Sequence, residues 1–230
     1  MRVLVVDVGN TRVKSAVVED GRVVDYPPYD RLGDVDADGI LVLSVVPSRT
    51  SKVLSLFNRD TVVVEKVKDS SLDELFPEQL GVDRVCAMLG AISRYPAPLV
   101  VVDAGTAVTV DFVGRDGKYV GGFIMPGVEL CLKALANGAE LLPYVSPEKI
   151  DGEVWEVEYT TEGSMLRGCV LGIAGGVDSI IRRMELHTGL QFFRVGSGGE
   201  FDLLTGWLSV DEIDNDIIFL GGWRLYVEGR

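Results

Sequence analysis

A strand-and-turn unit occurs twice in this chain and limits the fold more than any other feature. Each copy has an apolar run, an Asp-x-Gly turn followed by a small polar residue, a second apolar run, and an Asp-Gly turn. The first copy begins at Val3–Gly9 and the second at Val100–Gly105. In both, an Asp-Gly pair follows the first aspartate by thirteen residues, at Asp20 and at Asp116. A spacing shared over this length predicts two related modules.

The composition of the two Asp-x-Gly turns indicates phosphate chemistry. Glycine lets a phosphate approach the backbone, while hydroxyl and N–H groups donate to phosphate oxygens. A carboxylate at the same place holds a metal ion or its water shell. One such turn is weak evidence, because most Asp-x-Gly sequences are ordinary turns. Two turns in one chain suit a nucleotide with its metal.

The overall composition sets broad limits on the class of protein. The chain has 230 residues, 47% of them hydrophobic, and a formal net charge of −13, which argues against a nucleic-acid surface. The cysteines Cys86, Cys131 and Cys169 lack metal-ligand spacing, so we expect buried thiols in a reducing compartment. We expect neither a signal peptide nor a membrane span, and therefore a soluble cytoplasmic protein.

The order of the predicted elements favours mixed sheets. We expect the first module to run from residue 1 to about 98, with three strands, a strand at 40–46 ended by Pro47, a helix at 48–58, and a strand at 61–64. A helix at about 85–95 follows. Four strands before the first helix and one after it predict a mixed rather than a parallel sheet.

The second module, from 99 to 230, repeats this plan with longer connections. We expect Gly121–Gly127 to form a loop that opens a helix, and Thr161 to cap a long helix that ends near His187. Four glycines lie inside that helix and predict close packing against another backbone: Gly168, Gly172, Gly175 and Gly176. A strand at 192–195 ends in a glycine turn, and the apolar segment 217–223 has no clear type.

The pair Asp83-Arg84 allows two interpretations. Asp83 stands where the predicted helix 85–95 begins, so it can be a capping acid in the first turn. It can also be a general base beside a guanidinium that binds a carboxylate. Position alone does not separate the two. No nucleophile elbow, Walker A, zinc or Ser/His/Asp pattern occurs in the sequence.

Taken together, these motifs resemble those of the type III pantothenate kinases, in the actin/sugar-kinase/heat-shock chaperone (ASKHA) superfamily. The resemblance rests on an ordered set of motifs: Asp7–Thr11, Gly81–Arg84, Asp103–Asp111, Gly121–Gly127, the Thr161…Gly168 helix start, and Ser197–Gly199. It implies an α/β fold of two RNase H-like modules, 1–98 and 99–230, with mixed sheets flanked by helices and an ATP cleft between them.

The resemblance also implies roles for single residues. The implied ATP-binding residues are Asp7, Val8, Gly9, Asn10, Thr11, Arg12, Val13, Lys14, Thr106, Gly198 and Gly199. The implied pantothenate-binding residues are Gly81, Val82, Asp83, Arg84 and, reaching across the interface of a homodimer, Thr161. Asp83 would be the catalytic base on the substrate hydroxyl. Asp7 would help place Mg²⁺ through water, and Asp103 would bind a monovalent cation, K⁺ or NH₄⁺.

The implied reaction is the transfer of a phosphoryl group from ATP to pantothenate. The product would be 4'-phosphopantothenate, in the first step of coenzyme A biosynthesis, and no nucleic acid or membrane would be involved. Arg84 should keep Asp83 ionised. One feature departs from the family: a tyrosine expected near Glu74 is absent, and Phe76 is the closest aromatic residue.

Two alternatives stay open. One is a kinase of the same superfamily that acts on a different small alcohol. The other is a non-catalytic nucleotide-binding regulator, an accessory factor. The presence of Asp7, Asp83, Arg84 and Asp103 together speaks against a protein that has lost its activity.

Overall fold

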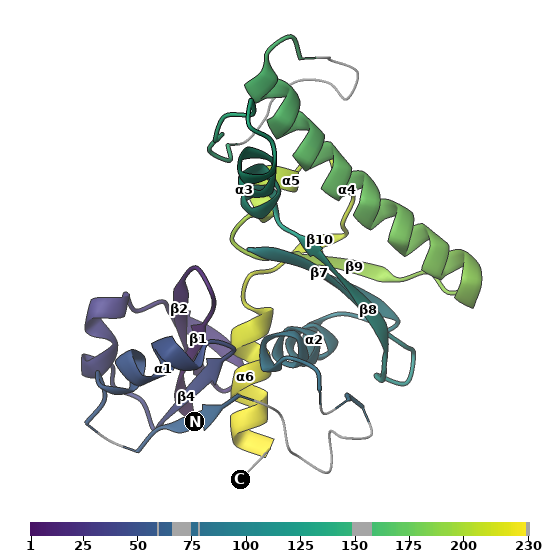
Figure 1. The fold of residues 1–230 in the computed structure, drawn as a ribbon. Coiled ribbons are helices and arrows are strands. Elements are labelled where there is room, and N and C mark those ends of the chain that lie inside the picture. The colour runs from purple at the N-terminus through teal and green to yellow at the C-terminus, as the bar shows by residue number, and fades with distance from the viewer. Residues whose placement is uncertain (59, 66–74, 78, 149–157, 229–230) are drawn as a thin grey trace. The chain divides into compact units, whose positions relative to one another are not determined.

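The computed structural model describes residues 1–58, 60–65, 75–77, 79–148 and 158–228. The chain divides into two compact units (Figure 1). Unit 1 comprises residues 1–97, 113–120 and 215–230, and unit 2 comprises residues 98–112 and 121–214. The compact units are defined by packing, whereas the expected modules 1–98 and 99–230 were defined by the repeat. The module boundary therefore stays a prediction.

Unit 1 is built on a five-stranded mixed sheet in the order β3-β2-β1-β4-β5. Its strands are β1 (Arg2–Val8), β2 (Val13–Glu19), β3 (Arg22–Asp25), β4 (Gly39–Ser44) and β5 (Val62–Val64). β1 is antiparallel to β2 and parallel to β4, and β4 is parallel to β5. The mixed sheet that the element order predicted is confirmed. Pro47 follows β4 closely and begins the next helix, because its fixed φ suits the first helical turn.

Unit 2 contains most of a second five-stranded sheet, in the order β10-β9-β6-β7-β8. Its strands are β6 (Leu99–Ala104), β7 (Ala107–Val113), β8 (Tyr119–Pro126), β9 (Phe193–Ser197) and β10 (Glu212–Ile213). Read in reverse, this order matches the first sheet strand for strand, with β6 in the place of β1 and β9 in the place of β4. The sequence repeat is therefore a structural repeat. The Asp-Gly pairs form tight turns, with Gly21 and Gly117 both at φ 77°.

Helices cover both sheets. They are the 3₁₀ helix η1 (Tyr29–Asp34), α1 (Pro47–Leu54), α2 (Val82–Arg94), α3 (Val128–Gly138), α4 (Thr161–Thr188), α5 (Phe201–Leu204) and α6 (Ile217–Glu228). The segment 217–223, whose type the sequence left open, is thus helical. In unit 1, Leu32 of η1 and Val53 of α1 join the core on one face of the sheet. Gly222 of α6 lies against Val5 and Leu43 of the sheet.

Helices α2 and α6 lie side by side in unit 1, at very close range (Figure 1). A Cβ atom at Gly90 of α2 would overlap the carbonyl oxygen of Ile217, and one at Gly221 of α6 would overlap that of Cys86. Glycine at both positions lets the two backbones touch. This contact joins the helix that follows the first sheet to the helix that follows the second.

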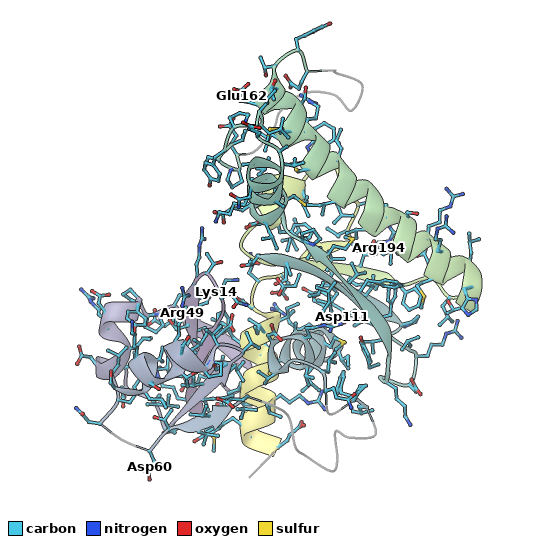
Figure 2. All side chains as sticks on the ribbon, viewed as in Figure 1. Lys14, Arg49, Asp60, Asp111, Glu162 and Arg194 are labelled. Atoms are coloured by element: carbon cyan, nitrogen blue, oxygen red, sulfur yellow. The ribbon has the colours of Figure 1, made fainter. Side chains whose placement is uncertain are left out.

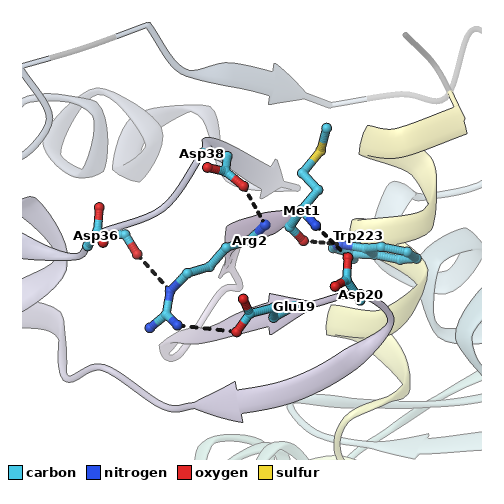
Figure 3. Close-up of polar contacts among 7 residues, drawn as sticks. All are labelled: Met1, Arg2, Glu19, Asp20, Asp36, Asp38 and Trp223. Atoms are coloured by element: carbon cyan, nitrogen blue, oxygen red, sulfur yellow. Dashed lines mark hydrogen bonds and ion pairs between the residues drawn. The ribbon is translucent and has the colours of Figure 1, made fainter.

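The N-terminus is fixed in unit 1 by polar contacts (Figure 3). The amino group of Met1 donates to Asp20, and the indole nitrogen of Trp223 donates to the Met1 carbonyl oxygen at 3.2 Å. Arg2 donates through Nε to the Asp36 carbonyl oxygen at 2.9 Å. These bonds hold the start of β1 to α6 and to the connection before β4.

The core of unit 2 forms between its strands and the long helix α4. Phe112 of β7 lies with Val170, Val177 and Ile181 of α4 in one apolar cluster. By length and composition alone α4 passes a test for a membrane-spanning helix, contrary to our expectation. A single helix of this kind is weak evidence, since the core helix of a soluble protein passes the same test. Its buried residues fit that second case.

One sequence prediction about unit 2 is wrong, and another is not met among the described residues of this chain. Residues 121–126 continue strand β8 instead of forming a loop, and only Gly127 caps the following helix. Close packing against another backbone is not seen at three of the four predicted α4 glycines: a Cβ atom at Gly168, Gly172 or Gly175 would meet none of the described residues within 4 Å. The sequence also predicts a loop rich in Pro, Gly and acidic residues at 137–155; α3 extends to Gly138, and residues 149–155 lie outside the described residues.

Candidate active site

The predicted phosphate turn is the tip of the β1–β2 hairpin. Val8 pairs with Val13, and the four residues between them form a turn closed by a bond from the Gly9 N–H to the Arg12 carbonyl oxygen at 3.1 Å. Asp7 pairs with Lys14 across the two strands. Cross-strand partners lie on the same face of a sheet, so this carboxylate and this ammonium group are neighbours at the base of the turn.

Helix α1 supports this turn through Arg49. Its guanidinium nitrogen Nη1 donates to the carbonyl oxygen of Gly9 at 3.2 Å. The start of the helix is fixed in turn by a 2.6 Å bond between the hydroxyl groups of Ser44 and Thr50. The sequence analysis missed Arg49, since nothing in its spacing connects it to a turn forty residues earlier.

The second predicted feature of unit 1, Gly81–Arg84, begins helix α2. The helix starts at Val82, three residues before the expected start, with Gly81 as its N-cap. Asp83 lies in the first turn, half-buried, and its Oδ1 accepts a bond from the Arg84 N–H at 2.8 Å. The helix dipole stabilises a carboxylate at this position. The helix-start placement is thus observed, and it is compatible with a role as base.

The side chain of Arg84 contacts a residue that the sequence analysis missed. Its Nη2 donates to the hydroxyl oxygen of Tyr119 at 3.1 Å. Tyr119 begins β8, and its N–H donates to the Leu75 carbonyl oxygen at 2.8 Å, so the ring reaches Arg84 from a strand next to residue 75. Phe76 is only 4% exposed and packs in the interior. The aromatic residue beside Arg84 is therefore Tyr119 and not Phe76.

The buried thiol of Cys86 connects the two predicted features of unit 1. Its pKa is raised well above the usual range, mainly by burial and further by the negative charges of Asp7 and Asp83. Both carboxylates are therefore close enough to Cys86 to act on its ionisation. The strand end that carries Asp7 and the helix start that carries Asp83 belong to the same compact unit.

In unit 2, three predicted loops converge at the end of β6. Asp103 pairs with Ser197 of β9, and the Glu200 N–H donates to the Ala104 carbonyl oxygen at 2.9 Å. Gly198 has φ 108°, and a Cβ atom there would overlap Ala104 and the Asp103 carboxylate. Glycine is required at this position both by the backbone conformation and by the space.

The third of these loops is the start of helix α3. The Gly127 N–H donates to the Thr106 carbonyl oxygen at 2.9 Å, and a Cβ atom at Gly127 would overlap the Gly105 carbonyl oxygen. The turn that follows β6, the turn that follows β9 and the N-terminus of α3 thus meet within unit 2. Asp103, Thr106 and Gly198 are brought together, as expected of parts of one phosphate or cation site.

Thr161 has a different local role from the one predicted. The N-cap of α4 is Thr160, whose side-chain oxygen accepts a bond from the Gly163 N–H at 3.0 Å. Thr161 is the first helical residue and is exposed. The prediction was wrong by one residue because two adjacent threonines satisfy the same capping rule.

The carboxylates of Asp7 and Asp103 suit metal ions whose other ligands are phosphate oxygens and water. Among the residues that the structure describes, no three His, Cys, Asp or Glu side chains gather into a metal-binding group. Mg²⁺ in nucleotide enzymes usually takes one or two carboxylates together with substrate phosphates. A single aspartate at the end of β1 and another at the end of β6 match that pattern.

The architecture defines the class of protein. Two sheets with the same strand order, each with an aspartate and a glycine turn at the end of its first strand, constitute the ASKHA fold of sugar kinases and actin-like ATPases. The activator of 2-hydroxyisocaproyl-CoA dehydratase from Clostridium difficile, solved with bound ADPNP, has a TM-score of 0.52 and 15% identity, covering 98% of this chain and 94% of that one.

The family follows from the sequence comparisons. A profile of the type III pantothenate kinases matches residues 29–183. The type III pantothenate kinase of Caulobacter vibrioides is 31% identical over 202 residues, covering 85% of this chain and 77% of that protein. A solved structure from Campylobacter jejuni, described as a Baf family transcriptional activator, has a TM-score of 0.56 and 21% identity and covers 98% of both chains. The chain belongs to the type III pantothenate kinase family of phosphotransferases.

Proposed function

We propose that the protein transfers the γ-phosphoryl group of ATP to the primary hydroxyl of pantothenate. The product is 4'-phosphopantothenate, and the reaction opens coenzyme A biosynthesis. The observation that carries the proposal is the placement of Asp83 and Arg84 in the first turn of α2, in the same compact unit as Asp7 of the phosphate turn. Family membership supports the choice of pantothenate as substrate.

Asp83 serves as the general base in this proposal. In phosphoryl transfer the hydroxyl proton leaves late, so a carboxylate within hydrogen-bond reach of the hydroxyl is sufficient. The N-terminus of α2 favours the charged form of Asp83. The bond from the Arg84 N–H to Asp83 Oδ1 restricts the side-chain rotamer of the proposed base.

Arg84 recognises the carboxylate of pantothenate. A guanidinium binds a carboxylate with two parallel bonds, which sets both position and orientation. Tyr119 accepts a bond from Nη2 and so restricts the plane of the guanidinium. Two neighbouring residues of one helix turn would then hold the two ends of a short substrate, the acid and the alcohol.

The nucleotide is held by the residues named for it in the sequence, Asp7 to Lys14, Thr106, Gly198 and Gly199. Lys14 and the N–H groups of the turn neutralise phosphate charge. Mg²⁺ bound to ATP neutralises charge on the transferred group, as in kinases generally. Asp7 would hold it through water, and Asp103 would hold a monovalent cation, K⁺ or NH₄⁺. The glycines of these turns support this, because glycine lets a phosphate approach the backbone closely.

The enzyme works as a homodimer in this proposal, with Thr161 contributed to the partner's pantothenate site. An apolar groove between α3 and α4, of about 670 Å³, includes Leu135, Met165, Gly168 and Gly172 in its lining. The glycines on this face have open space above them. A second copy of the chain would supply the close backbone packing that their positions predict. A cytoplasmic location completes the proposal.

The proposal is tested by measuring ADP formation with purified protein, with and without pantothenate, in K⁺ and then in Na⁺ buffer. Pantothenate-dependent turnover that is higher in K⁺ and yields a phosphorylated pantothenate by mass spectrometry supports it. Turnover with a different small alcohol but none with pantothenate contradicts the substrate. Binding of ATP without turnover on any alcohol contradicts the kinase and favours a nucleotide-binding regulator.

A further inference from the structure

Unit 1 contains a cationic cavity that shares residues 11–13 with the proposed ATP turn and is completed by residues to which the proposed reaction gives no part in binding ATP. The cavity has a volume of about 480 Å³ and lies between the tip of the β1–β2 hairpin, η1 and α1. Its polar lining consists of Thr11, Arg12, Tyr29, Arg49 and Lys52. Among the residues that the structure describes, no carboxylate lines it. We call it the α1 cavity.

The charge of the α1 cavity contrasts with that of the chain. The protein carries a net charge of −13, yet three cations meet here. Within the part of the chain that the structure describes, none of Arg12, Arg49 and Lys52 forms an ion pair. Arg49 and Lys52 are three residues apart on α1 and therefore share one helix face, where like charges destabilise the helix unless an anion lies between them.

The other walls of the α1 cavity select the kind of anion. Arg49 uses one N–H for the Gly9 carbonyl oxygen at 3.2 Å, which fixes the guanidinium and leaves its remaining N–H groups for a ligand. A fixed guanidinium favours phosphate, whose oxygens match its fork. Val53 is 1% exposed, and the ring of Tyr29 is 44% exposed. They offer an apolar floor and an aromatic surface.

We propose that the α1 cavity is a binding site for a small phosphate-bearing anion. The ligand class is a phosphomonoester or diphosphate with at least two negative charges. Arg49 and Lys52 provide most of the binding, and the ring of Tyr29 contacts the organic part. The site borders the turn that holds the phosphates of ATP, but Tyr29, Lys52 and Arg49 (labelled in Figure 2) are not among the residues assigned to ATP.

Occupancy of this site acts on the hairpin turn. The cavity is lined by residues 11–13, and Arg49 holds the carbonyl oxygen of Gly9, so an anion there restrains the turn at two points. This consequence rests on the proposed function, in which the turn binds ATP: a bound anion would change the KM for ATP. The binding itself does not depend on that function.

The test measures the melting temperature of the full chain against inorganic phosphate, with ionic strength held constant by chloride. The proposal predicts a concentration-dependent rise in wild type and an apparent affinity at least fivefold weaker in Lys52→Gln and in Arg49→Gln. Lys118→Gln is the matched control, because Lys118 is exposed and lies outside the cavity. It should keep the wild-type response.

A second arm separates this site from the nucleotide site. The titration is repeated with saturating ADPNP and Mg²⁺, and the chemical shift of the ¹⁵N-labelled Arg49 side chain is followed by NMR. A phosphate response that persists, with a shift at Arg49, supports the proposal. A response that disappears with ADPNP, or one equal in Lys52→Gln, Arg49→Gln and wild type, overturns it. Loss of pantothenate turnover alone would affect the proposed function only.

Discussion

Replacing Gly221 by alanine should destabilise the protein strongly, because the added methyl group has no space. The Cβ atom would overlap the Cys86 carbonyl oxygen and would lie 2.6 Å from its carbonyl carbon. Both are backbone atoms inside α2, so no side chain can rotate away, and the two helices must separate. Overpacking costs about 1–3 kcal/mol, and we expect about 3 kcal/mol here because only backbone movement relieves it.

The assay for this prediction is thermal unfolding followed by circular dichroism. For a chain of this length about 3 kcal/mol corresponds to a melting temperature lower by about 6–12 °C. Gly90→Ala, on the opposite side of the same contact, should behave in the same way. Gly138→Ala is the matched control, because a Cβ atom there meets nothing within 4 Å. It should raise the stability by about 0.5–1 kcal/mol.

A Gly221→Ala variant that melts within about 2 °C of wild type would refute the close contact between α2 and α6. A Gly138→Ala variant as unstable as Gly221→Ala would refute the reasoning in another way. It would show that helical glycines here are needed for reasons other than space.

Three further predictions concern single side chains. Burial raises the pKa of Cys169 to about 11, so the unfolded thiol ionises first and stability should fall between about pH 9 and pH 11; Cys169→Ala should melt with a smaller loss over that range. Thr160→Ala removes the N-cap of α4 and should cost about 1 kcal/mol by urea unfolding, whereas Thr161→Ala should change stability by less than about 0.5 kcal/mol. Tyr119→Phe removes the acceptor for Arg84 and should raise the KM for pantothenate roughly tenfold with little change in kcat, and an unchanged KM would contradict the positioning role.

The sequence was informative about the sheets because strand patterning and turn chemistry are local. Apolar runs ended by Asp-x-Gly, with Asp-Gly thirteen residues on, specify hairpins through properties of single residues, and the two sheets have the predicted common plan. The glycine-rich segment 121–127 misled the same reasoning. Glycines are typical of loops, but ladder pairing with β7 keeps this segment extended as β8.

The tertiary contacts of the site could not be predicted from the sequence, for a different reason. Arg49 and Tyr119 reach the predicted motifs from segments about 40 and 35 residues away in the chain, and neither position carries a pattern of its own. The prediction for the glycines of α4 started from a correct premise, the cost of glycine in a helix, but a Cβ atom at Gly168, Gly172 or Gly175 meets none of the described residues within 4 Å. The second copy that we propose would provide the packing that the prediction expects.

The most direct test of the central claim is the turnover of Asp83→Asn. Asparagine keeps the size of the side chain and removes its basicity. We predict that kcat for pantothenate falls by about 10²–10⁴-fold, while calorimetry shows pantothenate and ATP binding within about threefold of wild type. A kcat within about threefold of wild type would contradict the role of Asp83 as the base.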